Sequence, residues 1–186
     1  SYPKLVTNLI PNKIQLSTVT QILQNLLSEG IPVKDMRTIT EALTISKSEP
    51  SDADALTAEV RPKLGRMIIQ PLIDPAGKLT VITFAGDLER ILESSHQKSD
   101  GAHVLLEPKL AESILKALAD NAHQIQEKGA VPVLVVSPNL RQWLAKFVKL
   151  RVPELHVLAY TEIPEEQKIE LFGSIGGDNA IEDGGR

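Results

Sequence analysis

The sequence contains no cysteine among its 186 residues. A disulfide framework, a thiol nucleophile and a thiolate metal site are therefore excluded, and a reducing compartment fits the composition. An excess of basic charge is also missing, since 20 basic side chains face 24 acidic ones, for a net charge of −4. Because neutralising phosphates needs a basic surface, we expect no nucleic-acid partner. The longest uncharged apolar stretch, Gly129 to Leu140, is too short to cross a bilayer.

What the sequence does have is enough apolar residues, 42%, for a buried core, and a length that suits one ordinary domain or two small ones. No signal peptide opens the chain, and the composition favours a soluble, cytoplasmic protein. Since the chain begins at Ser1 and runs directly into predicted structure, we expect a piece of a longer protein. The pattern predicts an α plus α/β fold: a helical subdomain (1–70), a mixed α/β subdomain with a partly parallel sheet (71–176), and a flexible acidic tail (177–186).

The first subdomain has the periodicity of helices. We expect a short apolar turn or helix over 3–10, then helices over 17–29 and 34–45 and one that begins after a cap at Ser51 or Asp52. Ser17 is the expected N-cap of the second segment, and Gly30 is placed to end it in a left-handed conformation. The expected buried stripe of that segment is Val19, Ile22, Leu23, Leu26 and Leu27. Pro62 falls inside the last apolar pattern, which predicts a kink, a break or a restarted helix there.

The second subdomain alternates strand and helix, which predicts parallel neighbours in a sheet. We expect strands over 104–106, 133–136, 156–160 and 168–174, with helices over 87–95, 108–128 and 139–150. The turn chemistry of residues 74–78, between the apolar runs 67–73 and 79–84, predicts a hairpin. The strand over 133–136 has no polar alternation, which is typical of a central strand covered on both faces.

Catalytic motifs are absent from the sequence: it has no HExxH, no GxSxG and no phosphate loop ending in Gly-Lys-Ser/Thr. The glycine cluster at 173–177 follows a strand, but no helix opens after it, so a strand end is favoured over a nucleotide site. The histidines lack metal-site spacing (His96, His103, His123 and His156). Asp52 and Asp54 precede a helix, where carboxylates act as caps. We therefore predict no enzyme, no metal site and no cofactor.

The predicted helix over 139–150 is strongly amphipathic. Its apolar stripe consists of Leu140, Trp143, Leu144, Phe147 and Val148. A membrane-surface or partner-binding helix is one interpretation, but a helix that covers the sheet is favoured because strands are predicted on both sides of it. Its basic residues Arg141, Lys146 and Lys149 remain candidates for contact with a partner.

Several co-linear motifs then resemble one known family. They are residues 132–141 (PVLVVSPNLR), 152–155 (VPEL), 157–164 (VLAYTEIP), 2–6 (YPKLV) with 9–11, 19–29, 33–43 and 60–66. Together they resemble the FlhA/InvA/LcrD (FHIPEP) family of type III secretion export-gate proteins, over essentially residues 2–177. The opening YPKLV looks more flagellar than virulence-type. The sequence departs from the family pattern at Lys34, which stands where Arg is usual, and at residues 84–87.

The resemblance implies the third and fourth cytoplasmic subdomains of a protein embedded in the bacterial inner membrane. In that family the cytoplasmic domain forms a nonameric ring and docks export chaperones with their substrates and other export-apparatus components. The main chaperone site lies between the first and second subdomains, outside this chain. The same module from a virulence injectisome is the alternative, and an α/β nucleotide-binding or regulatory module is an alternative of another class.

In the family the third subdomain supplies much of the ring contact. The resemblance therefore points to the helices at 17–29 and 34–45 and to the segment around Arg61. Four charged residues become candidates for the subunit interface: Asp35, Glu41, Arg61 and Arg66. The competing interpretation is that they are solvated or cap helices.

Overall fold

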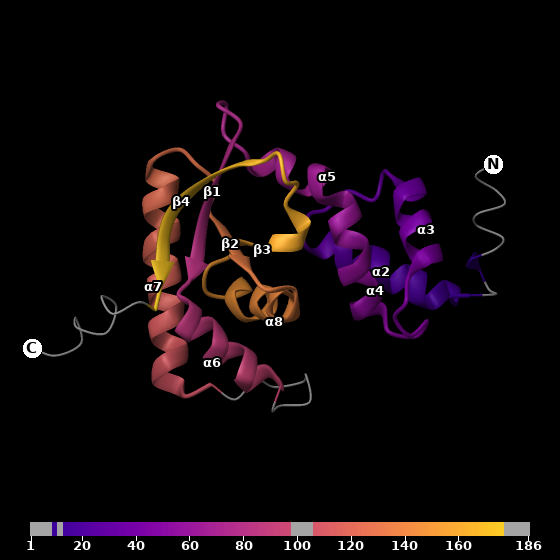
Figure 1. Cartoon of the computed structure of the whole chain (residues 1–186), viewed down its shortest axis with the longest axis horizontal. Coiled ribbons are helices and arrows are strands. Elements are labelled where there is room, and N and C mark those ends of the chain that lie inside the picture. The colour runs from indigo at the N-terminus through magenta and orange to yellow at the C-terminus, as the bar shows by residue number, and fades with distance from the viewer. Residues whose placement is uncertain (1–8, 11–12, 98–105, 177–186) are drawn as a thin grey trace, which may run out of the picture. The chain divides into compact units, whose positions relative to one another are not determined.

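The computed structural model describes residues 9–10, 13–97 and 106–176 (Figure 1). Contacts divide the chain into two compact units: a helical unit, up to Pro71 and including Glu162–Pro164, and an α/β unit, which comprises Leu72–Thr161 and the residues from Glu165 onward. The chain thus passes between the units three times. The predicted helix over 3–10 and strand over 104–106 lie largely, and the tail over 177–186 entirely, outside the described residues.

The helical unit consists of short helices that bury one face each. Its elements are α2 (Leu16–Ser28), α3 (Met36–Ile45), α4 (Ala53–Val60), the 3-10 helix η1 (Arg61–Leu64), α5 (Gly65–Ile69) and the start of the 3-10 helix η2 (Gln70–Leu72). On α2, Val19, Ile22 and Leu26 are buried, whereas Leu27 is 54% exposed. The prediction that Leu27 is buried was therefore wrong, because consecutive helical residues point about 100° apart and Leu27 leaves the buried face.

The ends of these helices follow local chemistry in most places. Gly30 has a φ of +74°, and the amides of Gly30 and Ile31 donate to Leu27 and Leu26, a Schellman motif that confirms the predicted stop. The predicted cap at Ser17 was wrong, since α2 begins after Gln15, which forms no side-chain cap bond. Pro62 breaks the helix as predicted: α4 ends at Val60 and η1 takes over.

The α/β unit is built on one four-stranded sheet. Its elements are β1 (Lys78–Phe84), α6 (Gly86–Gln97), α7 (Pro108–Glu127), β2 (Val133–Val136), α8 (Pro138–Lys149), β3 (His156–Ala159), the 3-10 helix η3 (Tyr160–Glu162), whose last residue belongs to the helical unit, and β4 (Lys168–Ile175). The strand order is β3-β2-β1-β4, and every described pair is parallel. This confirms the predicted mixed α/β class and the central place of β2.

One core cluster of this unit lies on the face of the sheet that carries Ile82. Ile82, Leu134 and Val157, which are neighbours across three strands, pack with buried residues of α6, α7 and α8. From β1 to β2 to β3 the chain steps in one direction across the sheet. Since such crossovers are right-handed, all three helices fall on the same face.

The predicted hairpin was wrong. The turn at residues 74–78 does form, with Gly77 at a φ of +77° and its amide donating to the Asp74 carbonyl at 2.9 Å. Its first arm, however, is helical, because Ile68, Ile69 and Leu72 are buried at helical spacing in α5 and η2. The second arm, β1, pairs with β2 and β4 instead.

Candidate functional site

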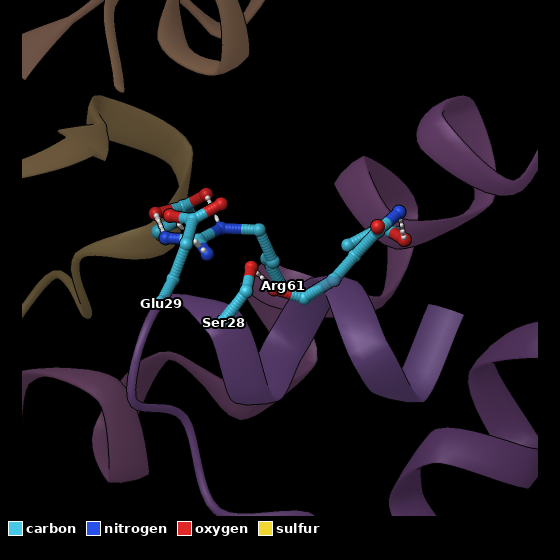
Figure 2. A network of polar contacts seen from close by, with 6 residues as sticks. Ser28, Glu29 and Arg61 are labelled. Atoms are coloured by element: carbon cyan, nitrogen blue, oxygen red, sulfur yellow. Dashed lines mark hydrogen bonds and ion pairs between the residues drawn. The ribbon is translucent and has the colours of Figure 1, made fainter. Parts of the chain in front are cut away.

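The most constrained polar cluster of the helical unit is centred on Arg61, the first residue of η1. Its Nε and Nη2 atoms donate to the two carboxylate oxygens of Glu162 at 2.6 and 3.1 Å, a bidentate pair. Its Nη1 atom donates to Glu29 at the end of α2, at 3.1 Å. Figure 2 shows the arginine side chain reaching the carboxylate of Glu29, next to Ser28. We call Arg61, Glu29 and Glu162 the arginine cluster.

Two of the three side chains of the arginine cluster are buried. The side chains of Arg61 and Glu162 are 1% and 2% exposed, whereas that of Glu29 is 28% exposed. Burial alone would lower the pKa of Arg61, but the hydrogen bonds and charge of Glu162, with a smaller contribution from Glu29, outweigh it and raise that pKa. The guanidinium is therefore a permanent cation held between two carboxylates.

Gly65 brings the backbone of the same segment close to α5. A Cβ atom at Gly65 would lie 2.2 Å from the carbonyl oxygen of Glu162, a separation that real side chains do not reach. Glycine at this position thus lets the chain around Glu162 pack directly on the helix backbone. Residues 162–164 are held in the helical unit by both a side-chain and a backbone contact.

The sequence pointed to Arg61 as a charge offered to a neighbouring subunit, but the structure encloses it among the chain's own carboxylates. An arginine this deeply buried needs an internal partner, and Glu162, 101 residues away, supplies it. Sequence reasoning assigned no role to Glu29 or Glu162. The only available signal was an acidic residue next to the buried strand β3, which is not specific.

The other three interface candidates lie on the surface of the helical unit. Asp35 caps α3 by accepting from the amide of Thr38 at 3.0 Å, and hydrogen bonding from the Thr38 side chain lowers its pKa. Glu41 pairs with Arg37 one turn earlier, at 2.8 Å. Arg66 is exposed on α5. Asp35 therefore has the capping role that the competing interpretation gave it, and the proposed subunit contacts stay predictions.

Helix α8 covers the sheet, which confirms the favoured interpretation of that segment. Leu140, Leu144 and Val148 are buried in the core. Arg141 is 4% exposed and so is not available as a surface charge, because it lies three and seven residues before Leu144 and Val148, on the same buried face of the helix. Lys146 and Lys149 are exposed and remain candidates for a partner contact.

A second surface on the helical unit was not foreseen. Leu16 and Leu27 are 64% and 54% exposed at the two ends of α2, with the half-buried Leu23 between them. Spacings of seven and four residues place all three on one side of the helix. We call these three leucines the α2 stripe. The spacing of these leucines is visible in the sequence, but the sequence pattern assigned Leu23 and Leu27 to the buried face of the helix.

The described residues give little support to metal or nucleotide chemistry. Among them, no group of three or more acidic or histidine side chains is arranged to hold a metal ion. Gly173 lies inside β4, where a Cβ atom would meet the Asn121 side chain of α7 at 2.9 Å, so it serves packing. No helix in the described part of the chain has the length and apolar character needed to span a membrane.

Comparison with known proteins agrees with this picture. The chain is 40% identical over 177 residues to the flagellar biosynthesis protein FlhA of Proteus mirabilis, and 38% identical over 175 residues to that of Escherichia coli K12. These matches cover 95% and 94% of the chain but 25% of each relative, so the chain spans about a quarter of their length.

Solved structures show the same fold. The Shigella flexneri MxiA protein superposes with a TM-score of 0.81 at 23% identity, over 94% of this chain and 56% of that one. The nonameric SctV-C of enteropathogenic E. coli (EPEC) gives a TM-score of 0.78 at 26% identity, over 94% and 52%. The pattern of the FHIPEP family matches residues 1–168. The chain is therefore a member of the FHIPEP family.

Proposed function

We propose that this chain is the cytoplasmic part of a type III protein export gate, on the inner side of the bacterial inner membrane. Its work there is ring assembly and the docking of export chaperones with their substrates and of other apparatus components, without catalysis. The observation that carries the proposal is the co-linear family match over residues 1–168, together with 40% identity to a flagellar FlhA protein.

Relatives support both parts of this proposal. SctV-C and the EscV cytosolic domain, each 26% identical to this chain, form nonamers, and Chlamydia pneumoniae CdsV, 27% identical, forms a complex with CdsO. A flagellar system is favoured over a virulence system because the FlhA relatives are 28–40% identical to this chain, against 22–27% for the solved type III secretion proteins. Complementation of motility in an flhA deletion strain distinguishes the two systems.

We further propose that the α2 stripe forms part of the contact between subunits of the ring. Two exposed leucines with a half-buried one between them are a costly surface for an isolated chain, and burying them against a neighbour would favour assembly. This replaces Arg61, which has no charge to offer at the surface, as the residue on which to test assembly.

The test is Leu27→Lys in the complete cytoplasmic domain, followed by mass photometry across a concentration series. We expect the concentration at half assembly to rise about tenfold or more, because one apolar contact per interface is replaced by a desolvated charge. Ile91→Lys, at a half-exposed position on α6, is the matched control and should assemble as the wild type does. Unchanged assembly of Leu27→Lys would refute the α2 contact. Micromolar binding of a labelled nucleotide would instead favour the nucleotide-binding alternative.

A further inference from the structure

Strand β4 forms one border of the sheet. It pairs with β1 on one side, and no strand among the described residues pairs with its other side (Figure 1). Its first four residues, Lys168 to Leu171, are all exposed, with Ile169 and Leu171 at 53% and 61%. The second half of the strand differs, because α7 packs on it: Asn121 lies against Gly173, and the Lys128 ammonium sits 4.6 Å from the centre of the Phe172 ring.

The exposed half of β4 has few of the features that protect natural edge strands. Such strands are usually short, carry charged side chains, are interrupted by proline or a bulge, or have an inward-pointing charge; the exposed half of β4 has only the charged side chains, those of Lys168 and Glu170. At eight residues β4 is the longest strand of the described sheet, and it contains no proline. Its one irregularity, the extra residue Phe172 opposite the Val81–Ile82 step of β1, comes after the four exposed residues. Residues 168–171 therefore present a regular backbone edge, on which the Lys168 carbonyl accepts a hydrogen bond from the Gln167 side chain at 2.9 Å.

The side chains of this edge continue a buried apolar row. Leu79 pairs with Ile169 and Val81 with Leu171, so each pair shares one face of the sheet. Leu79 is fully buried and Val81 is 3% exposed, whereas their partners on β4 are more than half exposed. One further strand beside β4 would place its own side chains next to Ile169 and Leu171, as these two lie next to Leu79 and Val81, and would reduce their exposure.

The charges along the edge indicate what such a strand would carry. Glu165 and Glu166 lead into β4, and Glu170 lies on the opposite face from Leu171. Lys168 is the one basic residue on the segment 165–171. Glu170 is paired with Lys78 of β1 at 3.0 Å, with both side chains about half exposed, so this pair is weakly held and open to a competing cation.

We infer that residues 168–171 of β4 form a docking edge for an extended segment of another protein, which adds to the sheet as a fifth strand. The segment carries apolar side chains two residues apart, to cover Ile169 and Leu171, with basic residues between them that face Glu170. Main-chain hydrogen bonds supply affinity, and the alternating side chains supply selectivity. We call residues 168–171 the β4 edge.

A second copy of the chain is the competing occupant. Two β4 strands could pair antiparallel about a two-fold axis with Lys168 opposite Glu170 of the other copy, an isologous contact. In the proposed ring all subunits face the same way around one axis, so neighbours cannot use an isologous contact. The choice of another protein thus rests on the proposed function in this one respect.

The test uses the 186-residue chain and an acetylated, amidated octapeptide that alternates valine and lysine. Fluorescence anisotropy of the labelled peptide gives the dissociation constant, and ¹H–¹⁵N spectra locate the bound peptide by shifted amides. Leu171→Lys should weaken binding about tenfold, and Glu170→Lys about fivefold. Matched controls are Leu150→Lys, at an apolar side chain directly after α8 that is 91% exposed, and Glu112→Lys on α7; both should leave binding unchanged. A peptide with proline in place of one of the inner valines should not bind.

Shifted amides confined to β4 and its neighbours, with the expected losses in the two edge variants, support the inference. It is overturned if the proline peptide binds equally well, if Leu171→Lys binds like the wild type, or if the shifts lie elsewhere. A doubling of mass that Leu171→Lys abolishes would overturn it in favour of a second copy. Since the peptide assay needs no ring, failure of the α2 contact and failure of the β4 edge are separate results.

Discussion

Replacing Arg61 by methionine separates the internal role of this residue from its predicted role between subunits. Arg61→Met keeps most of the side-chain volume but removes the cation that faces Glu162 and Glu29. Glu162 is 2% exposed and would be left as a buried carboxylate without its bidentate partner. Glu29, at 28% exposed, can be hydrated and should add little to the cost.

The magnitude follows from the burial of the pair. Removing one partner of a buried ion pair destabilises a protein by about 3–5 kcal/mol, because the remaining charge stays desolvated. Replacing both partners by apolar residues of similar volume is often close to neutral. We therefore expect Arg61→Met to lower the free energy of unfolding by about 3–5 kcal/mol, and the double variant Arg61→Met/Glu162→Met to recover most of that loss.

Urea unfolding followed by far-UV circular dichroism measures the effect. The single tryptophan, Trp143, lies on α8, so fluorescence follows the α/β unit, while hydrogen exchange of α2 and α4 amides follows the helical unit. The loss should appear first in α2 and α4. Arg37→Met is the matched control: its pair with Glu41 is 74% and 48% exposed, and its removal should cost less than about 1 kcal/mol.

Two results would refute this reasoning. A loss below about 1 kcal/mol for Arg61→Met would mean that Glu162 is hydrated or finds another partner, so the pair is not truly buried. A double variant as unstable as the single one would mean that packing of the arginine stem, rather than the unpaired charge, dominates.

Two further changes test the same unit. Gly65→Ala should destabilise by about 1–3 kcal/mol in urea unfolding, because its Cβ would meet the Glu162 carbonyl, whereas Gly86→Ala, with nothing within 4 Å, should be neutral or slightly stabilising. Hydrogen bonding from Ser48 lowers the pKa of Glu59 below its ordinary 4.5, so its stabilisation is present above that value and is lost as pH falls through the folded-state pKa. Glu59→Gln should therefore be less stable than the wild type at pH 7 and equal to it at low pH; an equal difference at both would contradict the assignment.

Local signals explain what could be predicted from the sequence. The helices α2, α7 and α8 begin and end within one or two residues of their expected bounds, because apolar periodicity and a glycine or proline at an end act over a few residues. The family resemblance likewise rests on short contiguous motifs. The prediction of a strand over residues 67–73 was wrong because a short apolar run fits a strand or a helix equally well. Only the packing of the folded chain decides between the two.

The sites could not be predicted in the same way, because they depend on exposure rather than on pattern. Arg61 and Arg141 are charged residues that the fold encloses, whereas Leu27 and Leu171 are apolar residues that it exposes. A sequence shows the type of each side chain but not the water around it. Candidate contacts chosen by charge therefore omit the exposed leucines and include two arginines that are not at the surface.

Residues 162–164 belong to the helical unit although they follow β3 in the chain. Glu162 is the last residue of η3, which follows β3 in the chain, yet its carboxylate and its backbone complete contacts with Arg61 and Gly65. Ordering that segment requires closing a loop of about a hundred residues, which the short-range contacts of α2 to α5 do not need. We infer that the helical unit gains its full stability only once β3 has formed. On this inference, a cut at the predicted boundary near residue 70 leaves a helical unit that lacks residues 162–164.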